Sequence, residues 1–160
     1  MATIELYGNT YEGETIEIRI DGEPIEVDRT QALTLRVTGN LAKLQTDLSV
    51  SIQGHVHGDV EAGGNVNCAN VDGDIEAGGS VTCGDVTGDV EAGGDVDCAD
   101  VEGNVEAGRD VTCATIAGSV SAGRDVSSAN VAGDVHASGD VSCSDVEGSV
   151  EAGGDVHSRG

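Results

Sequence analysis

The chain has 160 residues, among them 25 glycines and two tyrosines, and it contains no Phe or Trp. Lys and Arg number 7 against 30 Asp and Glu, so the formal net charge is −23. The scarcity of aromatic side chains argues against a broad globular core, and the length suits one domain or a domain with a small appendage. The negative charge argues against binding to nucleic acid and to anionic membrane surfaces.

The first 40 residues differ from the rest of the chain, because they hold the only Pro and both Tyr. Alternating apolar residues predict short strands here, and Asp21-Gly22 between two apolar runs predicts a hairpin turn. We therefore interpret residues 1–40 as a small β cap, and residues 41–55 as the first coil of the region that follows. The predicted strands of the cap are Thr3–Tyr7, Thr15–Ile20, Pro24–Val27 and Ala32–Val37.

From Val56 onward the sequence repeats every 15 residues through seven periods without an insertion. The coil around residues 86–98 reads Val86-x-Gly88, Val90-x-Ala92 and Val96-x-Cys98. Alternation of β-branched and outward-facing residues is typical of strands, and strict phasing is typical of solenoids. Three short strands per coil predict a triangular parallel β-helix over residues 41–160, with coils about 4.8 Å apart.

Two corners of the predicted coil carry glycine. We expect Gly93-Gly94-Asp95 to form a wide turn that can use positive φ. The invariant glycine at the Gly88-Asp89 corner predicts a crowded bend. Small residues on the inside, mainly Val, Ala and Cys, suit the narrow shaft of such a helix.

The unit Val71-x-Gly73-Asp74-Ile75-x-Ala77, with the following Val81-x-Cys83 and Val86-x-Gly88-Asp89-Val90, resembles the pattern of bactofilins over about residues 50–156. Bactofilins are right-handed parallel β-helices that polymerise end to end, without nucleotide, as bacterial cytoskeletal scaffolds. The resemblance implies right-handed winding and self-association. The chain departs from the family in its unvarying coil length, its cysteine column and its β appendage.

One corner column is acidic and predicts a ladder of carboxylates at the spacing of the coils. Hard cations such as Ca²⁺ favour clustered oxygen ligands, and a bound cation would relieve the repulsion between stacked like charges. The alternative is a solvated turn whose Asp side chains bond backbone amides. The residues of this possible metal ladder are Asp95, Asp110, Asp125, Asp140 and Asp155.

Three further columns or clusters carry chemistry. A Glu column faces outward and could bind a cationic partner or simply be solvated. The cysteine column could bind a soft ion or fill the shaft as small apolar groups, and its stacked geometry is not ideal for disulfides. His55 and His57 lie near Asp59 and could hold a metal or be incidental. The Glu column is Glu61, Glu76, Glu91 and Glu106, and the cysteines are Cys68, Cys83, Cys98, Cys113 and Cys143.

The sequence contains no Ser–His–Asp arrangement, P-loop or nucleophile elbow, and no long insertion that could build a cleft, which predicts a protein that is not an enzyme. The odd cysteine number, and an N-terminus unlike a secretory signal, predict a cytoplasmic setting. No apolar run approaches the length of a membrane-spanning helix. We predict a structural rod that forms a homo-oligomer or polymer, either end to end through free strand edges or through its cap. The alternative is a binding module in which the cap recognises a partner and the rod is a stalk, as in adhesins or phage appendages.

Overall fold

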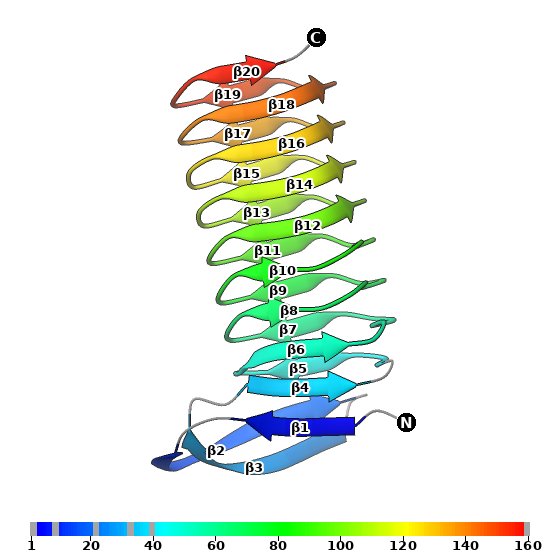
Figure 1. Cartoon of the computed structure of the whole chain (residues 1–160), viewed down its shortest axis with the longest axis vertical. Helices are drawn as coiled ribbons and strands as arrows, with labels where there is room; N and C mark the ends of the chain where they lie inside the picture. The colour runs from blue at the N-terminus through cyan, green and yellow to red at the C-terminus, as the bar shows by residue number, and fades with distance from the viewer. Residues whose placement is uncertain (1–2, 8–9, 21–22, 32–33, 39–40, 159–160) are drawn as a thin grey trace.

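The computed structural model describes residues 3–7, 10–20, 23–31, 34–38 and 41–158, and in these residues it shows strands and no helix. The strands wind into a β-solenoid of about eight turns, with coils of roughly 15 residues. The coils stack along one axis, with β1 near one end and β20 at the other (Figure 1). The predicted all-β parallel helix is therefore confirmed.

The strands of the cap pair antiparallel with one another and with the first coil. Strand β1 pairs with β4, and β2 pairs with both β3 and β5. Strand β4 also pairs parallel with β6, so parallel stacking already begins within residues 1–40. The predicted Asp21-Gly22 turn lies outside the described residues, but β2 and β3 on either side of it pair antiparallel as expected. The bounds are β1 Thr3–Tyr7, β2 Thr10–Ile20, β3 Glu23–Gln31, β4 Thr34–Thr38, β5 Leu44–Thr46 and β6 Ser49–Gln53.

Within the described residues, the cap and the coils together form two sheets of ten strands each. The first sheet runs from β1 and β4 through the even-numbered strands, and the second runs from β3 and β2 through the odd-numbered strands from β5 onward. In the first sheet these are β8 Val66–Asn67, β10 Val81–Thr82, β12 Val96–Val101, β14 Val111–Ile116, β16 Val126–Val131, β18 Val141–Val146 and β20 Val156–Ser158. In the second they are β7 Val60–Ala62, β9 Ile75–Ala77, β11 Val90–Ala92, β13 Val105–Ala107, β15 Val120–Ala122, β17 Val135–Ala137 and β19 Val150–Ala152.

The third side of the coil differs from the expectation of three separate strands. In the early coils it is reduced to single parallel bridges, such as Val56 with Val71. From β12 onward it is the end of the longer strand, where Val101 pairs with Ile116. Ala99 and Asp100 are both exposed in the middle of β12, which marks the corner around which this strand continues. The residue pattern predicted that the corner at Ala99 and Asp100 would separate two strands. In the structure, the backbone pairing continues through this corner.

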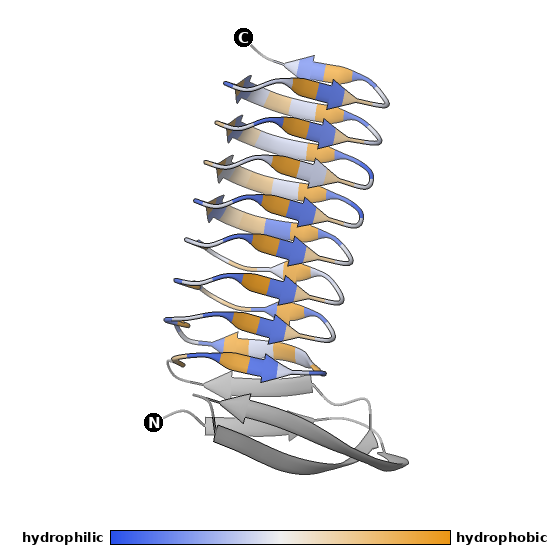
Figure 2. Cartoon of the chain, turned by 180° about the vertical axis from the view of Figure 1, so that it is seen from behind, coloured by the Kyte–Doolittle hydropathy of each residue, from blue (hydrophilic) through white to orange (hydrophobic). Residues whose placement is uncertain are grey.

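The core is a set of stacked columns, because each strand pairs in register with the residue one period away. Val90 lies beside Val105 and Ala92 beside Ala107, and all four are buried. Figure 2 shows apolar and polar residues alternating along the short strands, with the same colours recurring from coil to coil. Burial of the valines supplies the main driving force for stacking, at about 25 cal/mol for each Å² of apolar surface.

The corner glycines are required by the distance between coils and not by the shape of the turn. At Gly93 and Gly94, φ lies outside the left-handed region, so the expected use of positive φ is wrong. A Cβ on Gly93 would lie 2.5 Å from the carbonyl oxygen of Gly78 in the preceding coil. A Cβ on Gly88 would lie 2.5 Å from the carbonyl oxygen of Gly73, which confirms the predicted crowded bend. The Gly88 column is glycine in every period of the repeat because the backbones approach too closely there for a side chain, whereas the Gly93 and Gly94 columns admit Ser138 and Arg109 in later coils.

Candidate functional site

The acidic corner column that includes Asp95 is a ladder of hydrogen bonds between coils. The Oδ1 atom of each Asp accepts a hydrogen bond from the backbone N–H of the residue one coil later. The distances are 3.3 Å from Asp110 N to Asp95, 3.1 Å from Asp125 N to Asp110, 2.7 Å from Asp140 N to Asp125 and 2.8 Å from Asp155 N to Asp140. Lower in the same column, Ser49, Asn65 and Ser80 accept equivalent bonds at 2.8–3.0 Å. The corner therefore needs an acceptor oxygen, and a negative charge is not required for this role.

A second ladder of the same kind follows the glycine corner. Asp74 accepts from Asp89 N at 2.9 Å, and Asp89 accepts from Asn104 N at 2.6 Å. Neutral acceptors also occur in this ladder, since Asn104 and Ser119 follow Asp89 in the same role. This ladder was not predicted, although its signal is present in the sequence as an Asp, Asn or Ser that recurs once per period. Side-chain oxygens thus satisfy the backbone N–H groups at two corners, where strand pairing is interrupted.

Two of the predicted metal-ladder residues have basic partners. Arg109 Nη2 lies 3.2 Å from Asp95 Oδ2, and Arg124 Nη1 lies 3.5 Å from Asp110 Oδ2. These pairs are half-exposed and contribute under about 1 kcal/mol each. In the part of the chain that the structure describes, Asp125, Asp140 and Asp155 have no such cationic partner. Any cation on this column would therefore find its available carboxylate oxygens at the C-terminal end of the ladder.

The Glu column lines a shallow groove of about 760 Å³ on the outer face of the second sheet. Glu61 accepts a hydrogen bond from Gln45 Nε2 at 2.8 Å, and Gln45 continues the column toward the cap. The Glu side chains lie in register on neighbouring strands, as Glu76 does with Glu91. The groove presents a strip of carboxylates that would attract positively charged groups.

The cysteine column contains a disulfide. Cys68 and Cys83 are bonded between adjacent coils, with their Cα atoms 4.8 Å apart, so the expectation that stacking disfavours disulfides is wrong here. Cys98, Cys113 and Cys143 are buried free thiols. A hydrogen bond with Cys113, together with burial, raises the pKa of the Cys98 thiol. Burial also raises the pKa of the Cys143 thiol, whereas the hydrogen bond with Cys98 lowers the pKa of the Cys113 thiol. All three side chains are buried and fill the shaft as small groups.

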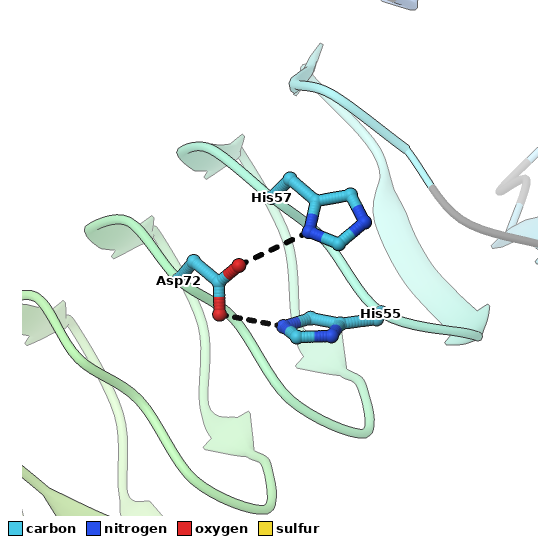
Figure 3. Close-up of side chains that lie close together, drawn as sticks. All are labelled: His55, His57 and Asp72. Carbon is cyan, nitrogen blue, oxygen red and sulfur yellow. Dashed lines mark hydrogen bonds and ion pairs between the residues drawn. The ribbon is translucent and has the colours of Figure 1, made fainter.

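His55 and His57 meet a carboxylate, but it is not the one expected from the sequence. Asp59 instead pairs with Lys43, whose Nζ lies 3.0 Å from Asp59 Oδ2. The carboxylate beside the imidazoles belongs to Asp72, which lies one period after His57 (Figure 3). His55 Nε2 lies 2.6 Å from Asp72 Oδ1, and His57 Nδ1 lies 3.0 Å from Asp72 Oδ2.

The electrostatics of this cluster follow from these two contacts. Hydrogen bonds from His57 and then His55 hold the pKa of the Asp72 carboxyl below its ordinary value. The two ring centroids are 4.6 Å apart. Among the described residues, this is the only group of three His, Cys, Asp or Glu side chains whose ligand atoms lie close enough to hold one metal ion. The repeat period was the signal that could have assigned Asp72 to the cluster.

The fold defines the class of this protein, which is a parallel β-solenoid repeat protein with hydrogen-bonded corner ladders. Among the described residues, no helix is long and apolar enough to cross a membrane. Comparison with known proteins finds no matching family model, no matching curated protein and no matching solved structure.

Proposed function

We propose that this chain is a non-enzymatic structural protein, a β-solenoid rod that self-associates end to end in the manner of the bactofilins it resembles. The observation that carries this proposal is the open face of the C-terminal coil. Val150 is 39% exposed and Val156 is 52% exposed, whereas their counterparts one coil earlier, Val135 and Val141, are each 1% exposed. A further coil stacked on these valines would bury them as fully as the valines of the inner coils, which is favourable because apolar surface is removed from water.

The free edges of the last strands also favour the C-terminal coil as the surface of self-association. Among the described residues, strands β19 and β20 end the two sheets, and each pairs on one side only. Free strand edges are templates for pairing with another chain. At the other end, the outer edges of β4 and β5 are already paired with the antiparallel strands β1 and β2. We therefore propose that a second copy of the chain docks through the same C-terminal coil, which joins two rods end to end as a dimer; a longer polymer would need a further contact through the cap.

Light scattering at several protein concentrations tests the proposal. The expected mass exceeds the 16.0 kDa of one chain and rises with concentration. Val156→Lys should shift the protein toward the monomer, because it places a charge in the proposed contact. Thr112→Lys, on an exposed position in the middle of the rod, is the matched control and should leave the mass unchanged. A strict monomer at every concentration, or equal effects of the two variants, would contradict self-association.

The proposal of a non-enzymatic role rests on the constant 15-residue period, which leaves no inserted loop to build an active-site cleft in residues 56–158. We also propose a cytoplasmic setting, from the odd number of cysteines. The Cys68–Cys83 disulfide is the observation against this setting, since such bonds persist in oxidising compartments. Alkylating thiols before cell lysis tests it: reaction of all five cysteines supports the cytoplasm, and protection of Cys68 and Cys83 contradicts it.

A stalk stabilised by calcium is the second candidate function. It is favoured by the absence of cationic partners, among the described residues, for Asp125, Asp140 and Asp155, which stack one coil apart. Calcium should raise the melting temperature more than magnesium does, because it accepts more oxygen ligands in flexible geometry. Asp140→Asn keeps the Oδ1 acceptor and should abolish the calcium effect. A melting temperature that does not respond to calcium would contradict this candidate.

A further inference from the structure

We propose that His55, His57 and Asp72 form a binding site for a divalent transition-metal ion, with Zn²⁺ as the representative ion. The candidate ligand atoms of the three side chains all lie within 4.8 Å of one another. Two imidazole nitrogens and a carboxylate form a donor set suited to Zn²⁺, Ni²⁺ and Cu²⁺. This site is independent of the self-association proposed above, because it lies in the first coils and not at the C-terminal face.

The backbone places the three ligands on one outward surface. His55 and His57 flank Val56, which is fully buried, so both imidazoles project to the same exposed side. Asp72 follows the buried Val71, which bridges to Val56 in the coil below. Because the coil spacing is set by this pairing, Asp72 lies directly beside the two rings (Figure 3).

The backbone of Asp72 is held from both neighbouring coils. Its N–H donates to the carbonyl oxygen of Val56 at 2.8 Å. Its carbonyl oxygen accepts a hydrogen bond from the Thr87 hydroxyl of the next coil. Because its backbone is already fixed, Asp72 loses little conformational freedom when it binds a metal ion, which favours the affinity for that ion.

The hydrogen bonds of the cluster show which atoms would bind the metal. Figure 3 marks one contact from each imidazole to Asp72, and an ionised Asp72 accepts a hydrogen bond along each of them. A metal would replace these two shared protons and bind His55 Nε2, His57 Nδ1 and an Asp72 oxygen. Each neutral imidazole keeps its proton, which moves to its other ring nitrogen, so no proton is lost on balance. Water would complete the coordination, since all three side chains are exposed to solvent.

The surrounding charge favours a cation but does not by itself select one. The chain carries a formal net charge of −23, which concentrates any divalent ion near the surface. Selection comes from the two nitrogen ligands, because Mg²⁺ and Ca²⁺ prefer oxygen ligands alone. The chain offers an internal comparison in His136, whose Nδ1 lies 3.3 Å from Glu151 Oε2 and forms only a pair.

Calorimetric titration of the full chain with Zn²⁺, in buffer with excess Mg²⁺ to occupy the carboxylates, tests the site. We expect one Zn²⁺ bound per chain. His57→Asn and Asp72→Asn should each lower the affinity at least about tenfold, because even the loss of a supporting group around a metal costs that much. His136→Asn is the matched control and should bind as the unchanged chain does. The absence of stoichiometric binding, or an equal loss in His136→Asn, would overturn the proposal.

Co²⁺ provides a second measurement that identifies the ligands. Bound to His55, His57 and Asp72, Co²⁺ should give a visible spectrum without thiolate charge-transfer bands, and His57→Asn should remove that spectrum. Thiolate bands would place the ion on Cys98 and Cys113 instead and would overturn the assignment. Circular dichroism of each variant shows whether the coils remain folded, which is expected because the substituted side chains are exposed.

Discussion

The side chain of Asp74 accepts a hydrogen bond from the backbone N–H of Asp89, 15 residues later, at 2.9 Å. The two residues occupy the same corner of adjacent coils, so the bond joins one coil to the next outside the sheets. Equivalent bonds at the neighbouring coils make this corner a continuous ladder. Part of the acidic composition of the chain therefore serves the stacking of its coils, through carboxylate oxygens that accept backbone N–H groups.

Asp74→Ala should lower the free energy of unfolding by about 1 kcal/mol, because it leaves the Asp89 N–H without its acceptor. Asp74→Asn keeps an acceptor oxygen and should unfold at nearly the same urea concentration as the unchanged chain. Glu91→Ala removes the same charge from an exposed position and should change the stability by less than about 0.5 kcal/mol. Equal losses in the two alanine variants would show that charge and not the hydrogen bond matters.

Gly88→Ala should destabilise the coils by about 1–3 kcal/mol, because the new Cβ would overlap the backbone of Gly73. Thermal or urea unfolding measures the loss. Glu102→Ala alters an exposed residue beside the equivalent Gly103 and serves as the control. If Gly88→Ala were as stable as this control, the close approach of the coils would not be the reason for the glycine.

Replacing Cys68 and Cys83 together by Ser should cost about 3 kcal/mol, since the disulfide closes a loop with a sequence separation of 15. The double replacement of Cys98 and Cys113 by Ser is the matched control in the same column and should cost less. Ser is tolerated in this column, because the Ser128 hydroxyl donates to the carbonyl oxygens of Ala114 and Asn130, each at 3.2 Å. Urea unfolding without reductant compares the two variants, and equal losses would contradict a stabilising disulfide.

The pKa of the Asp72 carboxyl should lie below its ordinary value of 3.8. Because the folded-state pKa is depressed, the stability from this pairing is present above pH 3.8 and is lost as the pH falls through the lowered pKa. Carboxyl NMR titration measures the value directly. His57→Asn should raise the pKa more than His55→Asn, since the hydrogen bond from His57 has the larger effect. An Asp72 pKa unchanged in both variants would contradict this cause.

Much of the fold could be predicted from the residue pattern, and the exceptions have local causes. Val90 and Ala92 alternate with exposed residues, so their strand and its inward face follow from side-chain direction alone. The continuation of β12 from the first sheet into the third side of the coil could not be predicted in this way, because it depends on backbone hydrogen bonds that continue around a corner. Gly93 was predicted to allow a positive φ in the turn, whereas in the structure the space for a side chain there is limited by the backbone of the preceding coil.

In the candidate sites, too, the residue pattern predicted which residues recur together, but it did not predict all of their partners. The Asp95 column was recognised from its period, with a cation ladder and hydrogen bonds to backbone amides as its two interpretations. The structure shows the hydrogen bonds, and their donors lie in the next coil and not in the same turn. His55 and His57 were recognised as neighbours on one face. Asp59, the nearest carboxylate in sequence, was predicted to lie beside them, but it forms an ion pair with Lys43. The carboxylate that contacts the imidazoles is that of Asp72, one coil away.

By itself the sequence determined the solenoid, because a strict 15-residue period of inward valines can bury its apolar face only by stacking like residues on like. The tertiary structure alone decided which side chains interact between coils: Asp72 with two imidazoles, Cys68 with Cys83, and the corner oxygens with the next backbone N–H. The reason is physical, since these contacts depend on side-chain rotamers and corner geometry that are set by the adjacent coil, and the local residue pattern does not encode them.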